Sequence, residues 1–91
     1  NFNLSQNYPN PFNPTTTINF STPKSQMVKI EVFDLQGRLI NSLYEGIAKP
    51  GENKVQWNAT DYNHQPMSTG VYIYRLTSGN YSKTRKMLYL K

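Results

Sequence analysis

Residues 8–14 have the sequence Tyr8-Pro9-Asn10-Pro11-Phe12-Asn13-Pro14. Three prolines within six residues hold φ near about −65° and remove backbone N–H donors, so this stretch can form neither a helix nor an inner strand. The asparagines between the prolines favour turns, because an Asn side chain can bond the backbone two residues further on. The aromatic rings of Tyr8 and Phe12 indicate that the stretch packs onto a folded body. We therefore expect residues 1–14 to be a proline-rich lead-in to a core formed by residues 15–91.

Short runs of β-branched and aromatic residues follow the lead-in, separated by turn residues. The clearest run is Met27–Phe33, where Val28, Ile30 and Val32 are expected to face a core and the residues between them to face water. Further strands are expected at residues 15–20, 38–44, 53–59, 71–77 and 81–91. About seven strands without helical periodicity predict an all-β fold, an immunoglobulin-like antiparallel β-sandwich.

Three positions support this architecture. Asp34 followed by Gly37 predicts a type I turn in which the glycine takes a positive φ, and hence a hairpin. Trp57 is the single tryptophan, and it is expected to fill the core rather than to stack on a ligand. Gly70 begins a run that is apolar on both faces, with Tyr72 on one of them, which predicts either a central strand or an outer face that meets a neighbour.

The charge is unevenly distributed along the chain. The first 74 residues hold as many acidic as basic side chains, so the formal net charge of +5 resides in residues 75–91. This segment can attract an acidic partner or an anionic surface; alternatively, its cations simply protect an edge strand against aggregation. Alternation in residues 81–91 does not decide which face is buried. The basic residues concerned are Arg75, Lys83, Arg85, Lys86 and Lys91.

The bulk composition limits what the chain can be. Ninety-one residues predict one domain with a modest core. The absence of cysteine excludes disulfides and thiolate metal sites, and no apolar run is long enough to span a bilayer. The first residues do not resemble a signal peptide, and without a starting methionine we expect a piece of a longer protein.

Catalytic chemistry is not indicated by the sequence. His64 is the only histidine and lies in a polar loop without partners, and the five acidic residues are scattered. We expect no enzyme, no metal and no cofactor. Nucleic-acid binding is disfavoured because no recognised motif accompanies the sequence pI of about 9.6. A carbohydrate-binding module of a secreted enzyme remains an alternative, unless the tyrosines that would stack on sugar rings pack in the core: Tyr44, Tyr62, Tyr72, Tyr74, Tyr81 and Tyr89.

Four motifs together resemble a known family. They are the proline-rich opening, Val32-Phe33-Asp34-Leu35-Gln36-Gly37, Gly70-Val71-Tyr72-Ile73-Tyr74-Arg75-Leu76 and the closing Lys86-Met87-Leu88-Tyr89-Leu90-Lys91. Their order and spacing resemble the type A C-terminal sorting domain of proteins exported by the type IX secretion system. The resemblance covers essentially the whole chain and implies an immunoglobulin-like sandwich. One departure lies at residues 58–64, where the family often has an acidic or Gly-rich stretch.

The resemblance also implies a function. Such a domain directs a fused cargo protein from the periplasm of a Gram-negative bacterium through the outer-membrane translocon of the type IX system. A sortase-like peptidase commonly removes the domain, and the cargo is released or attached to anionic lipopolysaccharide at the cell surface. The basic residues named above are the expected recognition contacts, and the last strand is expected to offer unpaired backbone groups to a receptor. The positions expected to be structural are Pro9, Asn10, Pro11, Phe12, Pro14, Gly37, Trp57, Gly70 and Tyr72. A structural spacer, like the immunoglobulin-like domain of flagellar hook-capping proteins, is a further alternative.

Overall fold

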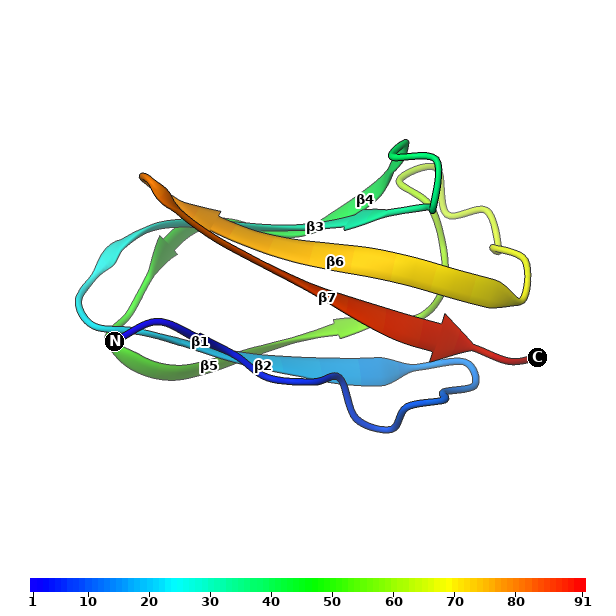
Figure 1. Cartoon of the computed structure of the whole chain (residues 1–91), viewed down its shortest axis with the longest axis horizontal. Helices are drawn as coiled ribbons and strands as arrows, with labels where there is room; N and C mark the ends of the chain where they lie inside the picture. Colours follow the sequence, from blue (N-terminus) through cyan, green and yellow to red (C-terminus); the bar gives the residue numbers. More distant parts are fainter.

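Seven strands form two antiparallel sheets stacked face to face (Figure 1). This computed structural model describes all residues, 1–91. The expected all-β sandwich is confirmed. The strands are β1 (Asn3–Leu4), β2 (Thr16–Thr22), β3 (Gln26–Phe33), β4 (Leu39–Ala48), β5 (Gly51–Trp57), β6 (Gly70–Ser78) and β7 (Tyr81–Tyr89).

The two sheets have the strand orders β1-β2-β5 and β4-β3-β6-β7. The pairs β3–β4 and β6–β7 are hairpins within one sheet, whereas the chain crosses between the sheets after β2, β4 and β5. As a result β6 lies between β3 and β7, which confirms the expectation of a central strand. The chain ends lie at opposite ends of the long axis (Figure 1).

Most strand boundaries differ from those expected; β5, for example, runs from Gly51 to Trp57 and not over residues 53–59. Strand β2 extends through Thr22, because Ser21 and Thr22 continue to pair with Glu52 and Gly51 of β5. Strand β4 extends to Ala48, opposite Gln26 of β3. Residues with weak intrinsic strand preference are therefore recruited by their neighbours in the sheet. The two-residue β1 was not expected at all.

The core follows the alternation of the strands. Val28, Ile30 and Val32 are fully buried, as predicted. Trp57 is 1% exposed, which confirms its place in the core. Its ring lies 5.3 Å from that of Tyr72 in an edge-on arrangement and 5.8 Å from that of Phe12. The lead-in thus contributes a ring to the main core.

The last strand buries the side chains of Met87 and Tyr89. Met87 pairs with Tyr72 of β6, and the Tyr89 ring lies 5.2 Å from that of Phe12. Leu88 is consequently directed to the outer face of the four-stranded sheet.

Residues 5–14, which we call the strap, connect β1 to β2 along the edge of the sandwich. Backbone hydrogen bonds join Tyr8 and Thr17 in both directions, at 2.9 and 3.0 Å. On the other side, the Phe12 N–H donates to the Leu88 carbonyl and the Leu90 N–H donates to the Phe12 carbonyl, each at 3.1 Å. The strap therefore bridges the two sheets.

The strap is held at its N-terminal end by a buried tyrosine. The Tyr74 hydroxyl accepts from the Asn7 N–H at 2.8 Å and donates to the Ser5 carbonyl at 2.7 Å. The Asn7 side chain is also buried, and its amide donates to Thr16 Oγ1 at 2.9 Å and to the Pro9 carbonyl at 3.1 Å. Burial raises the pKa of Tyr74 to about 12. The phenol is therefore a neutral clamp between β6 and the strap.

We predict that Tyr74→Phe destabilises the protein by about 1–3 kcal/mol, because two buried backbone groups lose their partner. Urea unfolding at pH 7 measures the loss. Tyr44→Phe is the matched control, since the Tyr44 hydroxyl donates to the Ile47 carbonyl at an exposed site, and it should cost no more than about 0.5 kcal/mol. Equal losses in the two variants would contradict the clamp.

The same hydroxyl gives an alkaline signature. Because the folded-state pKa of Tyr74, about 12, lies above its ordinary value of 10.0, its contribution is complete below pH 10 and is lost as the pH rises through 12. We expect the difference in unfolding free energy between the wild type and Tyr74→Phe to shrink over that range. A difference that stays constant from pH 9 to 12 would show that the phenol is not held neutral by the fold.

Candidate recognition surface

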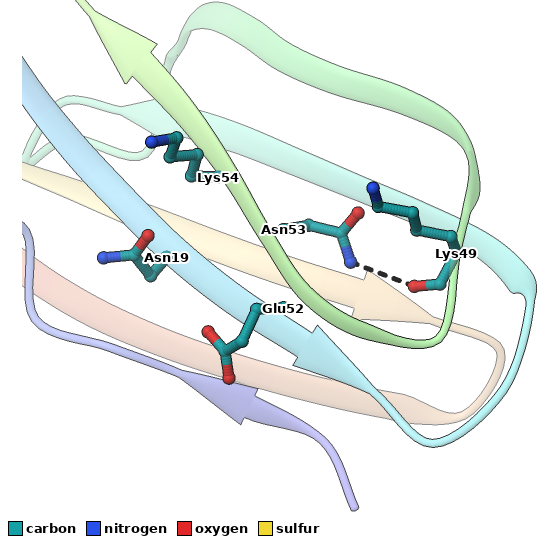
Figure 2. Close-up of a pocket in the computed structure, with 5 residues that line it drawn as sticks. All are labelled: Asn19, Lys49, Glu52, Asn53 and Lys54. Carbon is teal, nitrogen blue, oxygen red and sulfur yellow. Dashed lines mark hydrogen bonds between the residues drawn. The ribbon is translucent and has the colours of Figure 1, made fainter.

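The largest hollow lies on the polar outer face of β2 and β5 and has a volume of about 530 Å³. Figure 2 shows its lining, which is entirely polar: Asn19, Lys49, Glu52, Asn53 and Lys54. The Asn53 amide donates to the Lys49 carbonyl at 3.0 Å, and Glu52 is the single acid. No three His, Asp or Glu side chains gather anywhere in the protein as metal ligands would. The hollow offers no paired acid and base for catalysis.

The tyrosines considered for sugar stacking are mostly unavailable. Tyr72, Tyr74 and Tyr89 are buried, and Tyr44 and Tyr81 pack against the core. Of these candidates only Tyr62 is largely exposed, at 64%. A carbohydrate-binding face stacks several exposed aromatic rings against the sugar units, and one exposed ring among these tyrosines does not form such a face. The arrangement therefore argues against a carbohydrate-binding module.

The five basic residues of the last two strands are in different environments. Lys83, Lys86 and Lys91 are exposed. Arg85 is half-buried, and its Nε donates to the Leu4 carbonyl at 2.5 Å. This contact ties β7 to β1, so Arg85 has a structural role in addition to any recognition role.

Arg75 lies on the outer face of β6, the face that it shares with Ile73. Its guanidinium carbon is 4.5 Å from the centre of the Phe33 ring, a cation–π contact. Its Nη2 lies 3.6 Å from Glu31 Oε1, an ion pair longer than a hydrogen bond. Lys86 is opposite Ile73 in the register of β6 and β7 and lies on the same outer face.

The strap covers the edge of β7 at Lys86 and Leu88, so the expectation of unpaired backbone groups along the last strand is wrong for this part of the edge. The N–H of Leu88 donates to Asn10 Oδ1 at 3.0 Å, and its carbonyl accepts from Phe12. The Lys86 carbonyl accepts from the Gln6 amide at 2.7 Å. The strap occupies these positions because it crosses the edge between the sheets, and strand addition by a partner would first have to displace it.

The expected turn after β3 is confirmed. The Gly37 N–H donates to the Asp34 carbonyl at 3.0 Å, and Gly37 has a φ of 89°. Asp34 Oδ1 accepts from the backbone N–H groups of Gln36 and Arg38, and its Oδ2 accepts from Arg38 Nε at 2.9 Å. The Arg38 backbone N–H, first among these contacts, lowers the pKa of the Asp34 carboxyl below its ordinary value.

Sequence reasoning singled out the prolines and Phe12 but missed the polar residues that anchor them. Asn7, Thr16 and Tyr74 form the buried network around the strap. A buried Asn whose partners lie 9 and 67 positions further along the chain leaves no local pattern. The one available signal was Tyr74, in a run whose apolar residues lie on both faces.

The chain is similar in sequence to a protein family and in fold to several solved structures. Residues 6–90 match the model of a family described as the secretion system C-terminal sorting domain. No curated protein sequence matches the chain. The structure of dimeric latent PorU from Porphyromonas gingivalis is 21% identical, with a TM-score of 0.79. PorZ, a bacterial surface component of the type IX secretion system of the same organism, is 24% identical, with a TM-score of 0.66.

These structural relatives are much longer. The matches cover 98% of this chain and 9% of PorU, and 94% of this chain and 11% of PorZ, so the chain spans about a tenth of the length of each. FlgD from Xanthomonas campestris, a protein of flagellar hook capping, is 19% identical with a TM-score of 0.67, over 96% of this chain and 64% of that one. At these sequence identities the structural similarities establish only a shared β-sandwich fold. The functional assignment rests on the family match.

The Asp34 turn generates an acid-dependence prediction. Because the folded-state pKa of Asp34 is lowered, its contribution to stability is present above its ordinary value of 3.8 and is lost as the pH falls through the lowered value. We expect Asp34→Asn to lower the urea midpoint at pH 6 and the difference from wild type to shrink steadily below pH 4. Asp61→Asn, which removes a carboxylate that bonds only exposed turn N–H groups, is the control. A pH-independent difference for Asp34→Asn would contradict the assignment.

Proposed function

Because the chain belongs to the family of secretion system C-terminal sorting domains, we propose that it takes a larger cargo protein through the outer-membrane translocon of the type IX system. The chain is a sorting domain; the cargo, the translocon contact and the later steps are the proposal. A sortase-like peptidase then removes the domain, and the cargo is released or attached to anionic lipopolysaccharide at the cell surface. The route through the periplasm of a Gram-negative bacterium belongs to the same proposal.

One observation carries this function: the family match extends over residues 6–90, from the strap to the last strand. The match is therefore to a whole folded unit. We accordingly propose that residues 1–91 act as one domain, since Leu4 and Phe12 of the lead-in are buried in the same core as the later strands.

The contacts with the machinery are proposed to involve the basic residues of β6, β7 and the C-terminus. Lys83, Lys86 and Lys91 are exposed and have no acidic partner within the chain. Exposed cations steer an acidic partner over distances of about a Debye length. Arg85 supports them indirectly by holding β7 against β1.

Removing the last four residues is a poor test of these contacts. Such a truncation deletes Tyr89, which is in the core, and the bonds from Leu88 and Leu90 to the strap. Loss of export would then report misfolding as readily as lost recognition. Neutralising exposed lysines leaves the core and the strap in place.

We predict that a folded fluorescent reporter carrying residues 1–91 at its C-terminus is exported only in cells with a working type IX system. Replacing Lys83, Lys86 and Lys91 together by Gln should reduce export about tenfold by weakening electrostatic steering. The measurement is reporter fluorescence in the medium and at the cell surface, against the total in the culture.

The matched control replaces three exposed lysines elsewhere, Lys24, Lys49 and Lys54, by Gln, with the same change in net charge. We expect this control to be exported almost normally. Export of the unmodified fusion in cells lacking the system would refute the sorting function. Normal export of the variant without Lys83, Lys86 and Lys91 would show that these lysines are not recognition contacts and serve only to protect the edge strand against aggregation.

A further inference from the structure

The outer face of the four-stranded sheet carries a strip of apolar and cationic side chains along β6. Val71, Ile73 and Arg75 alternate outward on this strand. Their partners on β7 are Leu88, Lys86 and Thr84, in that order, and the partners of Ile73 and Arg75 on β3 are Phe33 and Glu31. We call this set the outer strip: Phe33, Val71, Ile73, Arg75, Thr84, Lys86 and Leu88.

Two hollows adjoin on the outer strip. The larger, of about 320 Å³, is lined by Phe33, Leu35, Ile73, Arg75 and Thr84, together with the turn at Asp34 and Gly37. The smaller, of about 170 Å³, is lined by Val71, Lys86, Met87 and Leu88, with Asn10 of the strap. Arg75 in the larger hollow and Val71 in the smaller one are four residues apart on β6, and side chains four positions apart on an extended peptide are separated by about 13 Å. The two hollows thus match side chains i and i+4 of an extended segment.

Arg75 is the charged group of the larger hollow, and its hydrogen-bonding capacity is unused. Its Nε is buried without any partner, and its nearest carboxylate, on Glu31, is 3.6 Å from Nη2. The other arginines differ, since Arg38 Nε donates to Asp34 and Arg85 Nε donates to the Leu4 carbonyl. Stacking on Phe33 holds the guanidinium plane, while 43% of the side chain stays exposed. A guanidinium held flat with free donors suits bidentate binding of a carboxylate.

The charges around the outer strip favour an acidic occupant. The carboxylate of Asp34 is already bound by Arg38 and by two backbone N–H groups. Lys86 adds a second, unpaired cation beside the smaller hollow. Apolar walls formed by Phe33, Ile73 and Leu88 favour a peptide over a polysaccharide, because a sulfated or phosphorylated sugar would leave them without apolar contacts.

We infer that the outer strip binds an extended segment of a partner protein that carries an Asp or Glu four residues from an apolar side chain. The carboxylate binds the Nη groups of Arg75 and the Thr84 hydroxyl in the larger hollow. The apolar side chain enters the smaller hollow between Val71 and Leu88. This inference rests on the proposed function in that the partner belongs to the export machinery, but the binding itself is testable without export.

The first test is selection of random dodecapeptides displayed on phage against residues 1–91, with counter-selection on Arg75→Gln. The selected peptides should contain an acidic residue four positions from an apolar one. As synthetic peptides, they should bind Arg75→Gln at least about tenfold more weakly than wild type, as expected for a lost charge-assisted hydrogen bond. Arg75→Lys, which keeps the charge but not the planar fork, should also bind more weakly.

Lys24→Gln, a charge loss in a distant loop, is the matched control and should bind as wild type does. Thermal unfolding followed by circular dichroism establishes that each variant is folded. If Arg75→Gln does not fold, Arg75→Lys takes its place in the binding comparison. The inference is overturned if no peptide is enriched, or if the enriched peptides bind Arg75→Gln as tightly as wild type. Binding of dextran sulfate that depends on Arg75, without any such peptide, would overturn it in favour of an acidic polysaccharide.

A second measurement separates this inference from the sorting function. Reporter fusions carrying Arg75→Gln or Lys24→Gln are compared with the unmodified fusion in cells with a working type IX system. Reduced export of the Arg75→Gln fusion alone is the expected result. If the unmodified fusion is not exported, the sorting function fails while the peptide selection still decides the binding site. If it is exported and Arg75→Gln has no effect, the outer strip is not used in sorting.

Discussion

The hydrogen bonds from the strap to both sheets join the beginning of the chain to its last strand. Residues 5–14 pair with Thr17 in β2 and with Leu88 and Leu90 at the end of the chain. The Tyr74 hydroxyl fixes the first residues of the strap, Ser5 and Asn7. A domain of this size buries a limited fraction of its surface, so this polar closure of one edge has a large effect on the order of the last strand. The basic end of the chain is presented in a fixed conformation only when the first residues are in place.

This dependence leaves a partner to meet the last strand as part of a folded surface. The last strand contributes Met87 and Tyr89 to the core, and its edge is covered by Asn10 and Phe12. What remains available to a partner is the set of side chains that the sheet directs outward. A folded surface loses little conformational entropy when it is bound, in contrast to a flexible tail that must be ordered.

The basic residues of the last two strands illustrate how one charge excess is divided among several roles. Arg85 uses its Nε on a backbone carbonyl of β1, and Arg75 stacks on Phe33 with its donors free. The exposed lysines are solvated point charges on flexible stems. Net charge alone treats these groups as equal, but burial and hydrogen bonding decide which of them can act on another molecule.

The amino-acid sequence alone determined the features that depend on near neighbours in the chain. These are the Asp34–Gly37 turn, the inward face of β3, the exclusion of regular structure from the prolines, and the location of the charge in residues 75–91. The motifs also sufficed to identify the family, because they recur in order over the whole chain.

Only the tertiary structure decided the rest. Residues 81–91 alternate similar side chains on both faces, and the buried face was chosen by the pairing of Met87 with Tyr72 and of Tyr89 with the strap. Strand β1 and the burial of the tyrosines likewise depend on residues distant in the sequence. The different roles of Arg75 and Arg85 depend on partners 42 and 81 positions away, Phe33 for Arg75 and Leu4 for Arg85. Such contacts exist only after the two sheets have closed on each other, and so no local pattern records them.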